Sequence, residues 1–315
     1  MNKLIGMEAE KKVLSLAVKC NLPALLMGDT GAGKTYLVRA LAEETNKKLI
    51  RINLNGETGI SELVGKWLLR DGTTHWQDGI LLDAIRHGHW VVLDEINAAL
   101  PEVLFTLNSL LDDSRSMIVC EKNNEIVNLH QDTRIFATCN PADDYSGVKE
   151  LNKALLSRFG VVVHVNYPEA DAEMEILKYH APEIDKEEAK TLVDVANILR
   201  EARDKEEISY ICSTRDIVQC SLIFCADGMS LQESIIYSIV GKAPKEDRQN
   251  IVNIIEKNLA IKLPKNCKRG DIQKLLSDYC KTIDELEKDR KVLKNRAQAL
   301  EDELRAVIDK AKKSN

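Results

Sequence analysis

The sequence predicts an α/β fold with a parallel five-stranded sheet, followed by a helical region and a long C-terminal helix. Three observations support this prediction. Short apolar runs alternate with helical patterns through residues 1–166, helical patterns without strand signals follow from about 171 to 261, and a heptad repeat begins after residue 271. With 315 residues, the chain is long enough for two packed domains and an appendage. We place their boundaries at 1–166, 167–262 and 263–315.

Five β-rich runs define the expected sheet. Each is almost continuously apolar, as is typical of parallel strands that helices cover on both faces. The runs are Ala24–Met27, Leu49–Asn53, Trp90–Leu93, Arg134–Cys139 and Val161–Val165.

Two β-hairpins are predicted as inserts in this α/β pattern, at about 64–79 and 116–130. The first turns at Asp71-Gly72, a strong two-residue turn signal. Counting outwards pairs Arg70 with Thr73, Leu69 with Thr74, Leu68 with His75, and Trp67 with Trp76. The second hairpin is predicted to turn at Asn123-Asn124, which pairs Cys120 with Val127 and Ile118 with Leu129. Both hairpins are either candidate partner-contacting loops or simple decoration of the core.

The C-terminal segment carries apolar residues at heptad spacing and many charged residues between them, which predicts a long helix. Three arrangements remain open: a coiled coil, an antiparallel packing against the chain's own body, and a solvated amphipathic helix. The apolar positions are Ile272, Leu276, Tyr279, Ile283, Leu286, Leu293, Leu300, Leu304 and Val307.

Composition excludes several classes. Hydrophobic residues make up 44% and charged residues 30%, which is ordinary for a globular protein, and the net charge of −6 disfavours a dedicated nucleic-acid binder. No apolar run reaches the roughly 18 residues of a membrane span, and the N-terminus lacks a signal-peptide pattern. We therefore expect a cytoplasmic protein.

The eight cysteines and six histidines show no metal-site spacing. No two cysteines form a C-x-x-C pair, so neither a zinc site nor a disulfide framework is indicated. We expect reduced thiols, most of which pack in the interior. His87 and His89 flank a glycine and are weak metal-ligand candidates.

The strongest motif is GDTGAGKT, which lies between an apolar strand and a helical pattern. This is the phosphate-binding P-loop in its required strand–loop–helix context. Its glycines allow backbone N–H groups to converge on phosphate oxygens, and the helix N-terminus adds partial positive charge. Lys34 is expected to reach the β- and γ-phosphates, and the Thr35 hydroxyl to bind Mg²⁺. The candidate nucleotide-binding residues here are Gly28, Asp29, Thr30, Gly31, Ala32, Gly33, Lys34, Thr35 and Tyr36.

Polar residues also follow two other predicted strands. Asp94 and Glu95 end the strand of WVVLDEIN, at the sheet edge where open α/β sheets bind ligands. We expect Asp94 to hold Mg²⁺ through water, and Glu95 to orient and polarise the attacking water. Asn140 follows RIFATC and is a candidate to hold that water or the γ-phosphate.

The residues from Ala24 through Glu169 resemble the dynein-related, midasin-like AAA+ ATPases, in the branch that contains MoxR, CbbQ and the CobS-type cobaltochelatase subunit. The helical region matches only in outline, and the heptad tail is not part of this family's core. The matching pieces are GDTGAGKT, ELVGKWLL, WQDGILLDAIRHGHWVVLDEINAALPEVL, RIFATCNPADDYSGVKELNKALLSRF and VNYPEADAEMEIL.

This resemblance implies further roles. Arg158, in LLSRF, matches the arginine finger that reaches the nucleotide of a neighbouring subunit, and Arg215, in STRD, looks like the sensor 2 arginine of the lid. Ile5 lies in a segment similar to the family's adenine-side turn. The hairpins look like the inserts that surround a central pore. The P-loop does not read the base, so ATP, the family's usual nucleotide, is the expected cofactor together with Mg²⁺.

The resemblance implies a hexameric ring that couples ATP hydrolysis to remodelling, activation or assembly of a client protein complex. Members of this branch often act with a partner that carries a von Willebrand factor A domain. Two alternatives stay open. The first is an NTPase motor subunit that acts on nucleic acid, which the acidic net charge disfavours. The second is a scaffold protein in which nucleotide binding only controls assembly.

Overall fold

The computed structural model describes residues 4–141, 151–226, 228–259 and 261–264. The described residues through Lys262 belong to one compact unit. The predicted heptad lies outside the described residues. The division of the chain at residue 166 into two domains stays a prediction.

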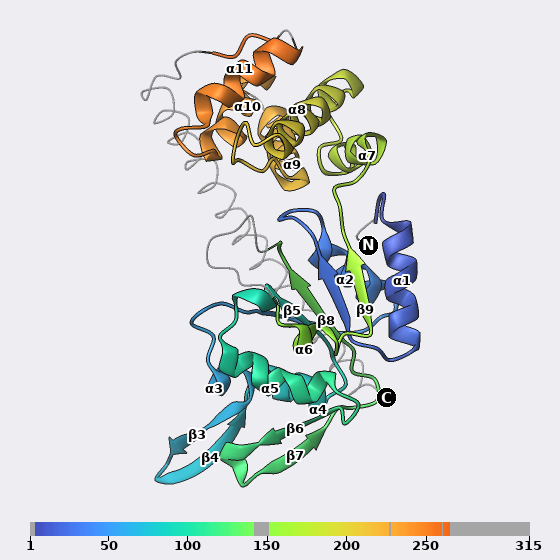
Figure 1. Cartoon of the computed structure of the whole chain (residues 1–315), viewed down its shortest axis with the longest axis vertical. Coiled ribbons are helices and arrows are strands. Elements are labelled where there is room, and N and C mark those ends of the chain that lie inside the picture. The colour runs from blue at the N-terminus through green and yellow to red at the C-terminus, as the bar shows by residue number, and fades with distance from the viewer. Residues whose placement is uncertain (1–3, 142–150, 227, 260, 265–315) are drawn as a thin grey trace, which may run out of the picture. The chain divides into compact units, whose positions relative to one another are not determined.

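The centre of this unit is a parallel five-stranded sheet with the order β2-β5-β8-β1-β9. β1, which precedes the P-loop, lies between β8 and β9, as Figure 1 shows. The predicted α/β fold is therefore confirmed. The strands are β1 (Ala24–Met27), β2 (Leu49–Asn53), β5 (Trp90–Asp94), β8 (Ile135–Cys139) and β9 (Val161–His164).

Helices cover both faces of the sheet because alternate side chains of each strand point to opposite faces. On β1, Leu25 packs in one core cluster, whereas Ala24 and Leu26 pack in the other. α1 (Glu8–Lys19) and α2 (Lys34–Glu44) contribute to the second cluster, and α4 (Ile80–Arg86) and α5 (Pro101–Leu111) to the first. Two further short helices in the described residues are α3 (Ile60–Leu63) and α6 (Lys153–Leu156).

The first hairpin, β3 (Gly65–Arg70) with β4 (Thr73–Asp78), has the predicted register. Trp67 lies opposite Trp76, and their ring centroids are 5.5 Å apart in an edge-to-face arrangement that stabilises such a ribbon.

The predicted register of the second hairpin, β6 (Ser116–Val119) with β7 (Glu125–Asn128), is wrong. Ile118 pairs with Ile126 instead of Leu129, and Val127 pairs with Met117 instead of Cys120. Cys120–Lys122 form a 3₁₀ turn, which Asn123 and Asn124 follow with positive φ angles. Because Cys120–Lys122 belong to the turn, they are not available for strand pairing, as they would be with a two-residue turn at Asn123-Asn124.

The two hairpins lie side by side below the sheet in Figure 1. The indole Nε1 of Trp67 donates a hydrogen bond of 2.8 Å to the carbonyl of Glu121, in the turn of the second hairpin. This bond joins two segments that are more than 50 residues apart in the chain.

The described chain after β9 is helical, as predicted, and three of its helices begin with a capping box, in which the N-cap side chain and the third helical residue bond to each other's backbone N–H. The N-caps are Asp185, Ser213 and Ser230. In the described residues, no helix has the length and apolar character needed to cross a membrane. The helices are α7 (Ala170–His180), α8 (Lys186–Asp204), α9 (Thr214–Cys225), α10 (Leu231–Ser238) and α11 (Arg248–Leu259).

Burial divides the described cysteines into protected and reactive thiols. Cys139 and Cys220 are buried, and burial raises the pKa of Cys139 to about 11 and that of Cys220 to about 12. Cys20 and Cys120 are exposed.

Because the thiolate is the nucleophile, iodoacetamide at pH 8 should alkylate Cys20 and Cys120 in the native protein and leave Cys139 and Cys220 unmodified. Mass spectrometry of digests gives the pattern, with urea-unfolded protein as the control. Equal labelling rates at Cys20 and Cys139 would contradict the assignment.

Candidate functional site

The carboxyl ends of β1, β5 and β8 border a cavity of about 440 Å³ that also reaches α7 and α9, in the region predicted as a helical lid, residues 167–262. Parallel strands bring their carboxyl ends to one edge, so side chains from distant parts of the sequence meet there. The volume lies within the range of small-molecule sites.

The P-loop can form this border only because its glycines allow close approach of other groups. A Cβ at Gly28 would lie 2.0 Å from the carbonyl oxygen of Val165. Gly31 has a φ of 78°, and a Cβ there would lie 2.6 Å from the Cβ of Ser213, at the start of α9. Any larger residue at either position would displace the loop.

The ammonium group of Lys34 lies at the centre of the loop. It donates hydrogen bonds to the carbonyls of Gly28 at 2.7 Å and Asp29 at 2.8 Å, and to Asn140 Oδ1 at 2.8 Å. Burial lowers the pKa of Lys34, and nearby acidic groups, Cys139 and Asp94 first, oppose that effect. A buried cation surrounded by acceptors at a helix N-terminus is suited to receive an anion.

The carboxylate of Asp94 is buried and receives hydrogen bonds from three side chains. Thr35 Oγ1 donates to Oδ1 at 3.0 Å, Thr138 Oγ1 donates to the same oxygen, and Arg51 Nε donates to Oδ2 at 2.7 Å. Burial by itself raises the pKa of Asp94, but these donors lower it below its ordinary value overall. Asp94 is therefore held as a carboxylate beside the Thr35 hydroxyl.

Glu95 is exposed and borders the same cavity. Its φ of 58° and ψ of 46° place it in the left-handed region, which is uncommon for a residue other than glycine, and its N–H donates to Thr138 Oγ1 at 3.1 Å. Such backbone strain is concentrated at functional sites. Here it ends the extended backbone of β5 at Asp94.

Asn140 is held from both sides. Its side chain accepts from Lys34, and its carbonyl accepts a hydrogen bond of 2.8 Å from Nδ2 of the buried Asn97. Asn97 thus fixes the backbone that presents Asn140 to the cavity.

These residues fit a magnesium–nucleoside triphosphate. Asp94 and Thr35 supply the hard oxygen atoms that Mg²⁺ prefers. Among the described residues, no group of three or more His, Cys, Asp or Glu side chains is arranged to hold a metal. The remaining ligands of a Mg²⁺ here would therefore be phosphate oxygens and water, as in sites where the metal binds with its nucleotide.

The structure places most of the predicted site residues at this cavity. Gly28 and Asp29 do not line it but hold Lys34 through their carbonyls. Arg158 lies away from the cavity, where its Nε is 2.5 Å from Asp112 Oδ1. The predicted residues that line the cavity are Ile5, Thr30, Gly31, Ala32, Gly33, Lys34, Thr35, Tyr36, Asp94, Glu95, Asn140 and Arg215.

Two residues in contact with Asp94 were missed by sequence reasoning. Arg51 is the charged residue of β2 and lies between two isoleucines, and an arginine at such a position indicates a buried acidic partner. Thr138 lies near the carboxyl end of β8, two residues before Asn140, and lines the same cavity. Only the strand order, with β5 between β2 and β8, shows that both meet Asp94.

Comparison with known proteins gives the family. Residues 23–159 match the AAA domain of the dynein-related subfamily, and residues 173–257 match the CbbQ/NirQ/NorQ C-terminal domain. The protein CbbQ of Hydrogenophilus thermoluteolus is 33% identical over 61% of this chain and 70% of its own length. The chain belongs to the CbbQ/MoxR-type AAA+ ATPases. The order of the two matched domains in this AAA+ ATPase agrees with the succession of α/β core and helices in the structure.

Other relatives of this AAA+ ATPase differ widely in length. Midasin of Dictyostelium discoideum is 36% identical over 76% of this chain, and an uncharacterised protein of Staphylococcus aureus is 29% identical over the same share. The chain spans 4% of that midasin and 91% of the S. aureus protein.

Replacing Arg51 with alanine should lower the Tm of the nucleotide-free protein by about 2 °C. The half-exposed Arg51 is the cation that faces the buried Asp94, so its loss costs roughly 1 kcal/mol. Differential scanning calorimetry measures the shift. Arg39→Ala, which changes an exposed arginine of the same cavity, serves as the control and should leave the Tm within about 1 °C. Equal Tm values for wild type and Arg51→Ala would contradict the role given to this pair.

Proposed function

We propose that the chain hydrolyses ATP with Mg²⁺ and uses the reaction to remodel, activate or assemble a partner protein complex. The observation that carries this proposal is the meeting of Lys34, Thr35, Asp94, Glu95 and Asn140 at one cavity. These are the groups that phosphoryl transfer to water needs: an anion-binding cation, metal ligands, a base and a polar group that positions water.

The geometry of the cavity supports the following roles. Lys34 and the N–H groups of the P-loop bind the phosphates, and Thr35 and Asp94 hold Mg²⁺, which neutralises charge on the phosphate oxygens. Glu95, exposed in the cavity and carried on a strained backbone, orients the attacking water and takes up its proton. Asn140 holds the water or the γ-phosphate without adding charge.

The lid contributes from the other side of the cavity. Arg215 lines it from the first turn of α9, beside the P-loop, and we assign it to the γ-phosphate. Ile5 and Leu4 line it from the chain that precedes α1, and their apolar side chains suit the adenine base.

The hairpins are the proposed contact with a client protein. Several of their large apolar side chains are exposed although both ribbons have well-paired strands: Trp67, Leu69, Ile118 and Ile126, with Leu69 at 74%. Apolar groups gathered on one part of a surface favour a protein partner. A partner with a von Willebrand factor A domain, and a hexameric ring, follow from the family resemblance and belong to the same proposal.

Replacing Glu95 with glutamine should lower kcat by at least about 100-fold and leave ATP affinity within about threefold of wild type, because the change removes the base but no phosphate contact. Lys34→Ala should instead weaken ATP binding by about 10- to 100-fold, since it removes a charged hydrogen-bond donor. Steady-state phosphate release and calorimetric titration with a nonhydrolysable ATP analogue measure the two effects. A turnover rate unaffected by both changes would refute the site.

The two alternative functions predict other results. A scaffold gated only by nucleotide binding would show no hydrolysis that depends on Glu95. A motor on nucleic acid would bind DNA tightly, with an affinity that falls steeply as salt rises. Filter-binding at several salt concentrations tests the second alternative.

Arg158→Ala should reduce turnover by about 1000-fold or more, if Arg158 completes the site of a neighbouring subunit. Mixing Arg158→Ala protein with Lys34→Ala protein should restore part of the activity, because Lys34→Ala subunits still offer Arg158 to intact P-loops. The control mixture replaces Lys34→Ala with the double variant Lys34→Ala/Arg158→Ala and should stay inactive. If mixed assemblies form on size-exclusion chromatography yet no ratio restores turnover, Arg158 does not act in trans.

A further inference from the structure

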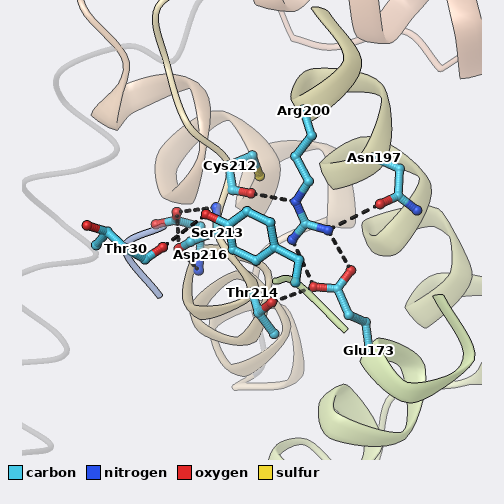
Figure 2. Close-up of polar contacts among 9 residues, drawn as sticks. Thr30, Glu173, Asn197, Arg200, Cys212, Ser213, Thr214 and Asp216 are labelled. Carbon is cyan, nitrogen blue, oxygen red and sulfur yellow. Dashed lines mark hydrogen bonds and ion pairs between the residues drawn. The ribbon is translucent and has the colours of Figure 1, made fainter. Parts of the chain in front are cut away.

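A buried ion pair connects two helices of the lid next to the P-loop (Figure 2). Arg200 of α8 donates to both carboxylate oxygens of Glu173 of α7, at 2.9 Å and 2.8 Å. Glu173 is fully buried. A two-point contact between a planar guanidinium and a carboxylate fixes their relative orientation, which a single hydrogen bond would not do.

Further hydrogen bonds surround this pair. Arg200 Nε donates 2.9 Å to the carbonyl of Cys212, and Nη1 donates 3.1 Å to Asn197 Oδ1. The hydroxyl of Thr214, the first residue of α9, donates 2.5 Å to Glu173 Oε1. The ion pair therefore holds α7, α8 and the start of α9 in one arrangement.

Tyr167 connects this arrangement to the P-loop. The Arg200 guanidinium carbon lies 3.9 Å from the centroid of the Tyr167 ring, a stacked cation–π contact. The Tyr167 hydroxyl donates 3.0 Å to the carbonyl of Thr30. A peptide unit is planar and trans, so fixing the Thr30 carbonyl also fixes the direction of the N–H of Gly31 on the opposite side of the same plane. That N–H belongs to the phosphate-binding loop.

The start of α9 touches the same peptide. Ser213, the N-cap of α9, packs against Gly31, where no side chain would fit. Ser213 is held by its capping box with Asp216, and Lys242 Nζ binds Asp216 at 2.5 Å. Arg215 lies between Thr214 and Asp216, so each of its neighbours in the chain is fixed by a side-chain hydrogen bond.

We propose that Tyr167 is a positioning residue that couples the P-loop to the lid: its hydroxyl sets the Thr30–Gly31 peptide for phosphate binding, and its stacking on Arg200 transmits that setting through Glu173 and Thr214 to Arg215. This inference rests on the proposed nucleotide site. It assigns the coupling to side chains that touch neither the cation of Lys34 nor the carboxylates of Asp94 and Glu95.

The test begins with Tyr167→Phe, which removes the hydroxyl and keeps the ring that stacks on Arg200. The dissociation constant of a nonhydrolysable ATP analogue should rise about three- to tenfold, the range of one hydrogen bond, and that of ADP should rise similarly. Thr214→Val keeps the side-chain volume and should reduce the preference for the ATP analogue over ADP, because Arg215 loses its fixed neighbour. The full-length chain is used, and calorimetric titration supplies the constants.

Ser209→Ala is the matched control. Like Tyr167→Phe, it removes one hydroxyl that donates a hydrogen bond. The Ser209 hydroxyl donates to the buried carboxylate of Asp247 at 2.7 Å, and that pair does not contact the P-loop. Its Tm change should be comparable with that of Tyr167→Phe, whereas its nucleotide affinities should match wild type within about twofold. A purely structural role for Tyr167 would make the two variants alike in both measurements, and that result would overturn the proposal.

A double-mutant cycle tests the connection itself. In the double variant Tyr167→Phe/Thr214→Val, the dissociation constant of the ATP analogue should differ at least about threefold from the value expected if the two single effects multiplied. In Tyr167→Phe/Ser209→Ala, the dissociation constant should agree with the product of the single effects within about twofold. Multiplicative effects in both pairs would overturn the coupling even if Lys34→Ala shows that nucleotide binds where proposed. Absence of any nucleotide binding by wild type would overturn both the function and this inference.

Discussion

The arrangement of the cavity depends on one buried ammonium group. Lys34 binds two carbonyls of its own loop, at the end of β1, and the side chain of Asn140, at the end of β8. A buried cation is stable only while its acceptors stay in place, so the contact fixes the loop relative to the neighbouring strand. The same sheet edge brings Asp94 from β5, which completes a pre-formed set of one cation and one carboxylate.

The groups around Asp94 show how a buried carboxylate is kept ionised. A carboxylate this deeply buried needs compensation, and it receives two hydroxyl donors and one guanidinium. Arg51 is half-exposed, however, so its cation can leave Asp94 at little cost once another positive charge is present. The buried carboxylate is therefore kept charged by a partner that solvent can reach.

Local patterns predicted most of the fold and the centre of the site. The five strands, the first hairpin and the residues of the P-loop follow from runs and motifs within a few residues of one another. The second hairpin failed because a 3₁₀ turn and two left-handed asparagines form a longer turn than the pair Asn123-Asn124 indicates. Arg51, Tyr167 and Arg200 could not be assigned, because their partners come from strand order and helix packing, which no local spacing encodes.

The positions of the three tryptophans have a practical consequence. Trp90 is enclosed in the core against Phe136, whereas Trp67 and Trp76 form the paired aromatic rings of the first hairpin. Trp67 is 49% exposed, and the indole also bonds to the turn of the second hairpin. The intrinsic fluorescence of the chain therefore combines a solvent-shielded tryptophan in the core with a solvent-sensitive tryptophan on the first hairpin. A protein that docks on the hairpins would change the emission of Trp67 but not that of Trp90, so its binding could be followed without an attached dye.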